Sequence, residues 1–198
     1  MRELATGLWH WTAAHPEWTP EAGGPDGWPQ EVSSYAIDTA EAFVVVDPVA
    51  PPSLLDELAA GRPVAVVLTC RWHERDSAAV VERLGAPVYS PPQAGAESTV
   101  VTRDYEPGDE LPGGVVAHGT LEPGDSVLWV PSVGALVFGD SLIDRGRGLE
   151  IPATWTSTRA SVEERAATLR PLLELPVEHV LPTHGQPSGR TALERALA

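Results

Sequence analysis

Short runs of apolar residues recur along this chain, and most have the length and spacing of β-strands. Residues 32–38 alternate between apolar and polar side chains, whereas residues 42–46 and 63–69 are almost continuously apolar. Alternation is typical of a strand with one buried face, and a continuous β-branched run is typical of a strand buried on both faces. The pattern predicts strands at residues 4–13, 32–38, 42–46, 63–69, 87–89, 114–120, 126–130, 134–138 and 177–181, with a further candidate at 99–103.

Helical spacing is found in four segments between these strands. The clearest begins at Ser161, which forms a capping box with Glu164 ahead of apolar residues at 162, 166, 169 and 173. Ser53, with Asp56 placed to complete a cap, and Asp76 are the expected starts of two earlier helices. We therefore predict helices at residues 53–60, 76–84, 161–173 and 188–198.

The order of these elements predicts a layered fold. Hairpins come first, at 32–46, strands and helices then alternate, and the arrangement loosely repeats in the second half, where 126–138 form another hairpin. Such an order favours an α/β or α+β domain in which mixed sheets are covered by helices. The length of 198 residues is suited to a single domain covering residues 1–198.

Charge narrows the range of partners. The chain has 28 acidic and 13 basic residues, a net charge of -15, and every basic residue is arginine. A strongly acidic protein is a poor partner for nucleic acid or an anionic membrane, so we expect a small-molecule substrate or ligand. The absence of lysine excludes Schiff-base chemistry on the chain, whereas arginine can still bind anions.

The single cysteine and the apolar runs bear on location. One cysteine cannot form an internal disulfide and fits a reducing compartment. No apolar run approaches the length of a membrane span, and the residues after Arg2 lack the apolar segment of a signal peptide. We expect a cytoplasmic protein; the sequence allows a homo-oligomer and does not define the oligomeric state.

Polar side chains that could bind a metal or take part in catalysis follow three predicted strands. Cys70, His73, Glu74 and Asp76 follow the strand at 63–69, Asp140 follows 134–138, and His184 follows 177–181. Imidazole, carboxylate and thiolate groups are the protein ligands of zinc. This distribution indicates a zinc or di-metal hydrolase site at the ends of the strands, where a metal would activate a water molecule.

Several motifs in this order resemble those of the metallo-β-lactamase superfamily. They are Val44-Val-Val-Asp47-Pro48, Leu68-Thr69, Val137-Phe-Gly-Asp140-Ser-Leu142 and Val180-Leu-Pro-Thr-His184-Gly185. The resemblance implies an αββα sandwich, two mixed β-sheets flanked by helices, with metals at one edge. It also implies that Asp140 corresponds to the family's bridging aspartate and His184 to its last histidine ligand.

The main metal-binding motif of the family is incomplete in this chain. The family has His-x-His-x-Asp-His directly after Leu-Thr, whereas residues 70–75 read Cys-Arg-Trp-His-Glu-Arg. Without a gap, only Glu74 is a like-charged replacement. With a gap, anchored on the segment 85–89, His73 takes the place of the last histidine. The family's middle histidine should fall near residues 120–122, where the chain has Thr-Leu-Glu and His118 is out of register.

The remaining residues near this motif have less specific roles. Glu74 is a candidate weak ligand or general base, and Asp76 is better suited to cap its helix than to bind a metal. Cys70 is a candidate ligand, although a lone cysteine at a strand end is commonly structural. Arg71, Trp72 and Arg75 are candidate substrate-binding residues, and solvated or acid-paired arginines are the alternative.

Two functions remain open on these residues. The first is a hydrolase of an ester, thioester or lactone that uses one metal held by Asp140, His184 and a third ligand among His73, Glu74 and Cys70. The second is a non-catalytic relative whose metal-free cleft binds a small molecule or a protein. A third hypothesis makes Cys70 a nucleophile with His73 as its base.

Overall fold

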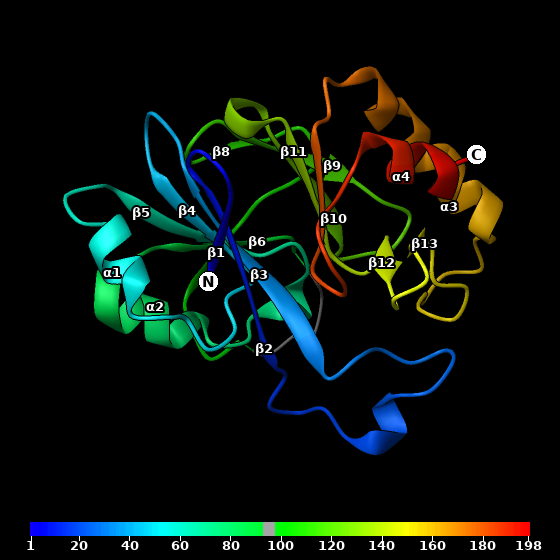
Figure 1. The fold of residues 1–198 in the computed structure, drawn as a ribbon, viewed down its shortest axis with the longest axis horizontal. Helices are drawn as coiled ribbons and strands as arrows, with labels where there is room; N and C mark the ends of the chain where they lie inside the picture. The colour runs from blue at the N-terminus through cyan, green and yellow to red at the C-terminus, as the bar shows by residue number, and fades with distance from the viewer. Residues whose placement is uncertain (93–97) are drawn as a thin grey trace.

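Two β-sheets pack face to face, and helices cover the outer side of each (Figure 1). The computed structural model describes residues 1–92 and 98–198. The first sheet has the spatial order β1 (Arg2–Ala5), β2 (Leu8–Ala14), β3 (Glu31–Asp38), β4 (Phe43–Val46), β5 (Val64–Val67), β6 (Val88–Ser90) and β7 (Thr102–Asp104). The second has the order β15 (Ser188–Gly189), β14 (His179–Pro182), β11 (Ala135–Phe138), β10 (Ser126–Val130), β9 (Val115–Gly119) and β8 (Glu110–Leu111). A separate ribbon pairs β12 (Ile143–Asp144) with β13 (Leu149–Glu150).

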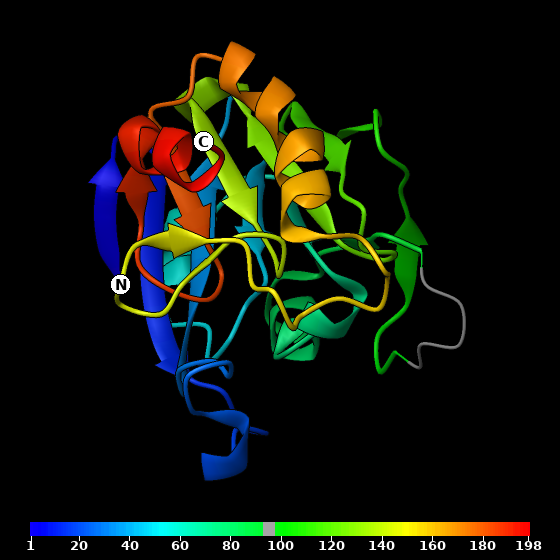
Figure 2. The same ribbon diagram turned by 90° about the vertical axis from the view of Figure 1, so that its right-hand side faces the viewer.

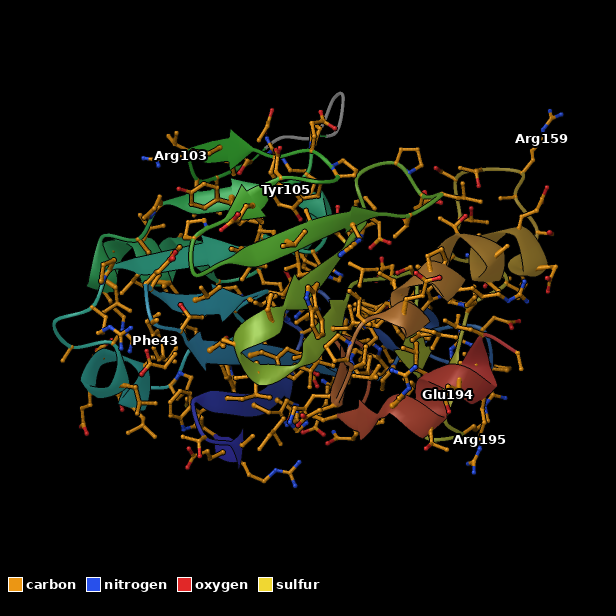
Figure 3. The ribbon with its side chains drawn as sticks, turned by 90° about the horizontal axis from the view of Figure 1, so that it is seen from above. Phe43, Arg103, Tyr105, Arg159, Glu194 and Arg195 are labelled. Carbon is orange, nitrogen blue, oxygen red and sulfur yellow. The ribbon has the colours of Figure 1, made fainter. Side chains whose placement is uncertain are left out.

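The helices complete an αββα arrangement, as predicted. Helices α1 (Leu54–Leu58) and α2 (Ser77–Leu84) lie outside the first sheet, whereas α3 (Val162–Leu169) and α4 (Arg190–Ala196) lie outside the second. Figure 2 shows α3 and α4 in front of the second sheet. On α4, Leu193 is fully buried, whereas Glu194 and Arg195 project outward (Figure 3), so one face of the helix covers the sheet and the other meets solvent.

The central strands are buried on both faces, which explains their continuous apolar runs. In β4, Val44 and Val46 pack between the two sheets, whereas Phe43 and Val45 pack under α1 and α2. Successive side chains of a strand point to opposite faces, so one run of four residues contributes to two cores. A third apolar core lies between the second sheet and α3, α4 and the turn at Arg170–Glu174.

Most predicted connections are present. The pairs β3–β4 and β10–β11 are antiparallel hairpins, and the pairs β4–β5, β5–β6 and β11–β14 are parallel. The capping box of α3 is formed, with Ser161 accepting from the Glu164 backbone N–H. Within the described residues, no helix is both long and apolar enough to span a membrane.

Several predicted boundaries were wrong. The strand expected at 4–13 is two strands, because Gly7 adopts a φ of 77° and turns the chain between β1 and β2. Ser53 lies at a helix start without a side-chain cap, since its own backbone is already helical. The last helix begins at Arg190, because Ser188 and Gly189 pair with β14.

The core between the sheets gives a direct stability test. Leu128 on β10 is fully buried, so Leu128→Ala should lower the free energy of unfolding by about 2–5 kcal/mol through lost burial and a residual cavity. Leu54 on α1 is 41% exposed, so Leu54→Ala should change the free energy of unfolding by no more than about 0.5 kcal/mol. Urea denaturation of both variants checks this, and equal losses would contradict the assignment of Leu128 to the core.

Candidate metal centre

Three strand ends deliver the central side chains to one edge of the sandwich. In the parallel pair β11–β14, Phe138 lies opposite Pro182, so Asp140 and His184 each follow their strand by two residues. The first sheet contributes through β5, which continues into a turn at Arg71–His73. An isolated bridge between Cys70 and Asp125, together with a hydrogen bond from Ser126 N–H to Thr69 O, joins the two sheets at this edge.

His73, Asp140 and His184 converge on one another. His73 Nε2 and His184 Nε2 each lie 3.3 Å from Asp140 Oδ1, and the two nitrogens are 3.4 Å apart. Both histidines are buried, and 18% of the Asp140 side chain is exposed. Although both nitrogens are close, Asp140 Oδ1 has no aligned hydrogen-bond donor among the described residues. The three donor atoms therefore lie at the corners of a nearly equilateral triangle, whose centre is a shared point about equally far from each.

The spacing of these atoms fits a small metal ion. Donors at about 2.0–2.2 Å from a tetrahedral zinc are about 3.3–3.6 Å apart, which matches the three distances. Two imidazoles and one carboxylate that leave a fourth position open are also the ligand number of a catalytic zinc site. The donor set therefore fits a single metal.

Asp47 holds His73 in the orientation that a metal ligand needs. His73 Nδ1 lies 2.9 Å from Asp47 Oδ2 and 3.2 Å from Thr69 Oγ1. Asp47 Oδ1 also accepts a 2.8 Å hydrogen bond from Thr69 N–H. A carboxylate on one imidazole nitrogen leaves the other free to coordinate a metal, so Asp47 acts behind the ligand. In the sequence, Asp47 stands before Pro48 directly after a predicted strand, a setting typical of a turn.

Protonation of the three groups is set by burial and by mutual charge. Burial and Arg75 oppose a charge on His73, but Asp140 and Asp47 outweigh both and raise its pKa to about 9. Burial is the largest influence on His184 and lowers its pKa to about 4. Burial opposes the charge of Asp140, yet the two histidines hold its pKa well below the usual value. Without a metal, His73 and Asp140 therefore form a buried ion pair beside a neutral His184.

Two further groups contact this triangle. Trp72 Nε1 donates a 2.6 Å hydrogen bond to Asp140 Oδ2, which leaves Oδ1 directed at the histidines. Cys70 Sγ lies within 4.8 Å of donor atoms of both His73 and Asp140. Its thiol, however, donates to Asp125 Oδ1 at 2.9 Å and is fully buried.

Cys70 and Asp125 form a compact pair next to the triangle. Burial and Asp125 raise the pKa of the Cys70 thiol well above its ordinary value, while burial and Asp140 raise the pKa of Asp125 to about 7. Asp125 Oδ1 also accepts from Asp140 N–H at 3.1 Å. The backbone of Gly139 lies so close that a Cβ there would collide with Cys70 and Asp125. In the sequence, residues 122–125 read Glu-Pro-Gly-Asp, a composition typical of a turn.

The other predicted site residues lie around the triangle without facing it. Glu74 accepts from Ser98 and Thr99, and Asp76, at the N-cap position of α2, accepts from Ala50 N–H instead of capping the helix. Arg71 donates to Thr102 and Asp104, and Arg75 donates to the backbone carbonyls of Ser33 and Asp47. The polar groups of Glu74, Asp76 and Arg71 are therefore bonded to residues outside the triangle. Arg75 lies beneath the site, bound to the backbone.

A cavity of about 380 Å³ opens above the triangle. Besides the triangle and Trp72, its lining consists of His15, Glu17, Trp28 and Trp155. Trp28 and Trp155 each pack edge-to-face with His184, with ring centroids 5.2 Å apart. Trp28 lies in a stretch rich in proline and glycine, and Trp155 lies in a stretch without periodicity, so no sequence pattern marks either as a site residue.

The solved structures that are similar to this chain share its architecture. TTHA1623, in a di-iron-bound form, is 26% identical over 90% of this chain and 98% of its own, with a TM-score of 0.63. The metallo-β-lactamase DIM-1, exposed to ceftazidime, is 15% identical over 99% of this chain and 93% of DIM-1, with a TM-score of 0.71. The metallo-β-lactamase FIM-1 from Pseudomonas aeruginosa, in the mono-zinc form, is 15% identical over 98% of this chain and 91% of FIM-1, with a TM-score of 0.69.

These comparisons define the fold class. The chain has the metallo-β-lactamase fold, which confirms the resemblance carried by its sequence motifs and the predicted αββα sandwich. No protein-family model and no curated protein sequence matches the chain. The similar structures include metal-bound forms. In this chain, donor atoms of Cys70, His73 and Asp140 lie close enough together to hold a metal ion.

His10 connects the fold to the loop that carries His184, and its titration can be tested. His10 Nε2 lies 2.9 Å from Ser33 Oγ, which donates to Gly185 O at 2.6 Å. Burial, followed by the charge of Arg2, lowers the pKa of His10 from 6.5 to about 4. The unfolded chain therefore takes up this proton first as the pH falls, so the contribution of a neutral His10 is complete above pH 6.5 and declines towards pH 4.

Replacing His10 by phenylalanine should remove this part of the pH dependence. Between pH 7 and pH 5, the native protein should lose about 1–2 kcal/mol more unfolding free energy than His10→Phe, after allowance for solvent screening. Phenylalanine preserves the stacking on Tyr35, whose ring lies 5.2 Å from that of His10. Urea titrations at both pH values measure the difference; parallel losses in both proteins would show that His10 is not responsible.

Proposed function

We propose that the protein is a metal-dependent hydrolase of an ester, thioester or lactone, with one metal ion held by His73, Asp140 and His184. The convergence of their three donor atoms at 3.3–3.4 Å supports this assignment most directly. The similarity to metal-bound structures of the same fold is consistent with it. We take the metal to be zinc, because two imidazoles and a carboxylate suit it well.

The chain's own residues prepare this site for a divalent cation. Asp47 binds the Nδ1 side of His73 and leaves Nε2 directed at the shared point. Asp140 supplies one negative charge, and Trp72 fixes its outer oxygen. The neutral state of His184 leaves a lone pair available without the loss of a proton. A metal held there would supply Lewis acidity towards a carbonyl and would lower the pKa of a bound water.

Cys70 and Asp125 support a site for one metal instead of two. Their hydrogen-bonded pair lies beside Asp140, where Asp125 Oδ1 accepts from both the Cys70 thiol and the Asp140 N–H. A protonated thiol is a donor and not a metal ligand, and burial raises the pKa of Cys70. The same features oppose a role for Cys70 as the nucleophile.

The alternative function is a non-catalytic cleft that binds a small molecule or a protein. The observation in its favour is that His73 lies between Asp47 and Asp140, so its charge is balanced without a metal. Such a cleft would retain its shape in a protein that never binds a metal.

Metal titration separates the two functions. Metal-free protein should bind about one Zn²⁺ per chain by calorimetry, and His184→Ala should weaken binding by more than about 100-fold, because a direct ligand is lost. His179→Ala provides the matched control, since this half-buried histidine lies on β14 outside the triangle. No binding to native protein that is folded by circular dichroism would refute the hydrolase and favour the cleft.

The role of Asp47 can be measured in the same titration. Asp47→Asn keeps the size of the side chain but removes the charge behind His73, so zinc affinity should fall about 10–100-fold while the stoichiometry stays near one. Glu41→Gln, at an exposed position in the β3–β4 turn, is the charge-matched control. An unchanged affinity for Asp47→Asn would show that Asp47 serves the fold alone.

A serine at position 70 tests the number of metals and the nucleophile hypothesis together. Cys70→Ser keeps a donor to Asp125 and should still bind about one Zn²⁺ per chain, and native protein should resist alkylation by iodoacetamide, because the thiol is fully buried and protonated. Elemental analysis and mass spectrometry provide the readouts. Two metals in native protein, falling to one in the variant, would make Cys70 a ligand.

A further inference from the structure

The cavity above the triangle has walls made largely of indole rings. Trp28, Trp72 and Trp155 all line it, and each comes from a different loop or turn. Its volume of about 380 Å³ is suited to a small organic molecule. Indole faces attract both apolar groups and cations, and aromatic cages are a common way to bind quaternary ammonium groups.

The loops that carry two of these rings are bonded to each other. Trp155 Nε1 donates to Asp26 O at 2.9 Å, and Arg145 Nε donates to Gly27 O at 2.6 Å. Trp18 Nε1 donates to the backbone carbonyl of Trp28 at 2.9 Å, which holds the chain at this second tryptophan in place. The walls are therefore held in place before any ligand enters, and less ordering is needed on binding.

Charge in the lining favours a cation over an anion. Glu17 and Asp140 contribute carboxylates, and burial lowers the pKa of His15, which opposes a positive charge on that side chain. The sequence contains no lysine, and no arginine is among the described residues of the lining. His73 lies between Asp47 and Asp140, at 2.9 and 3.3 Å, so a carboxylate flanks its ring on either side.

One cation already contacts a wall of this cavity. The Arg145 guanidinium lies over the Trp155 ring at 5.3 Å and is paired with Glu150 at 2.8 Å. Arg145 is not among the residues that line this cavity, so the contact lies outside it. Arg145 is bound by Glu150, which it shares with Arg147, and by the carbonyls of Asp26 and Gly27, so its guanidinium is not free to bind a substrate carboxylate.

We propose that the wall formed by Trp28, Trp155 and Glu17 binds an organic cation, such as a quaternary ammonium group, carried by the substrate. The reacting carbonyl of that substrate would then face His73, Asp140 and His184, a step that rests on the proposed hydrolase function. The cation site itself needs no metal. The net charge of -15 would also draw such a substrate towards the protein.

Acetylcholine and 3,3-dimethylbutyl acetate are suitable probes, because they differ only in a nitrogen cation against a neutral carbon. Metal-free protein, titrated in about 150 mM salt to screen surface charge, should bind acetylcholine about 5–30-fold more tightly than the neutral ester, by calorimetry or tryptophan fluorescence. Because the metal is absent, this result is independent of hydrolysis and of the zinc titration.

Variants locate the binding to the proposed wall. Glu17→Gln should weaken acetylcholine about threefold or more and leave the neutral ester unchanged, whereas Glu41→Gln should change neither. Trp155→Leu and Trp28→Leu should each reduce the preference for the cation, with circular dichroism confirming that the variants fold.

Three results would overturn the proposal. They are equal affinity for both esters, no binding of acetylcholine by folded native protein, and acetylcholine binding that is unaffected by Glu17→Gln and by both tryptophan variants. If the cation binds as expected but zinc does not, the cation site stands and the hydrolase function fails. If zinc binds and the cation is not preferred, the hydrolase stands with a different substrate class.

Discussion

The buried carboxylate of Asp47 is the contact on which the site depends. It lies just after β4, accepts from the backbone N–H of Thr69 just after β5, and binds the Nδ1 side of His73. One side chain thus fixes where the first sheet ends and which nitrogen of His73 faces the second sheet. The backbone of Asp47 has a φ of 45°, a conformation that residues other than glycine rarely adopt. The surrounding hydrogen bonds hold it in this conformation.

The parts of the structure with regular periodicity could be predicted from sequence. Strands β3, β4, β5, β10 and β11 follow from their apolar runs, and the three polar strand ends were predicted because side chains at the ends of neighbouring strands gather at one edge. His73 was among the residues predicted for the site. Its assignment over Glu74 follows from the turn at Arg71–His73, which directs His73 inward and which no periodic pattern indicates.

What could not be predicted depends on contacts between distant segments. Asp125 has the sequence setting of a turn, and its contact with Cys70 arises only because the two sheets meet there. Trp155 lies in a stretch without periodicity, and its place beside His184 is set by its bond to Asp26, on a loop far away in the sequence. The rigid strand ends thus carry the proposed metal ligands, and the loops carry the proposed substrate contacts.

Gly139 limits how this site can change over evolutionary time. Its bare backbone packs directly against Cys70 and Asp125, so a side chain at position 139 would collide with both. Any substitution of this glycine would force Cys70, Asp125 or the chain before Asp140 to move, and the carboxylate that completes the triangle would move with that chain. The position of Asp140 therefore depends on a residue that contributes no side chain to the site.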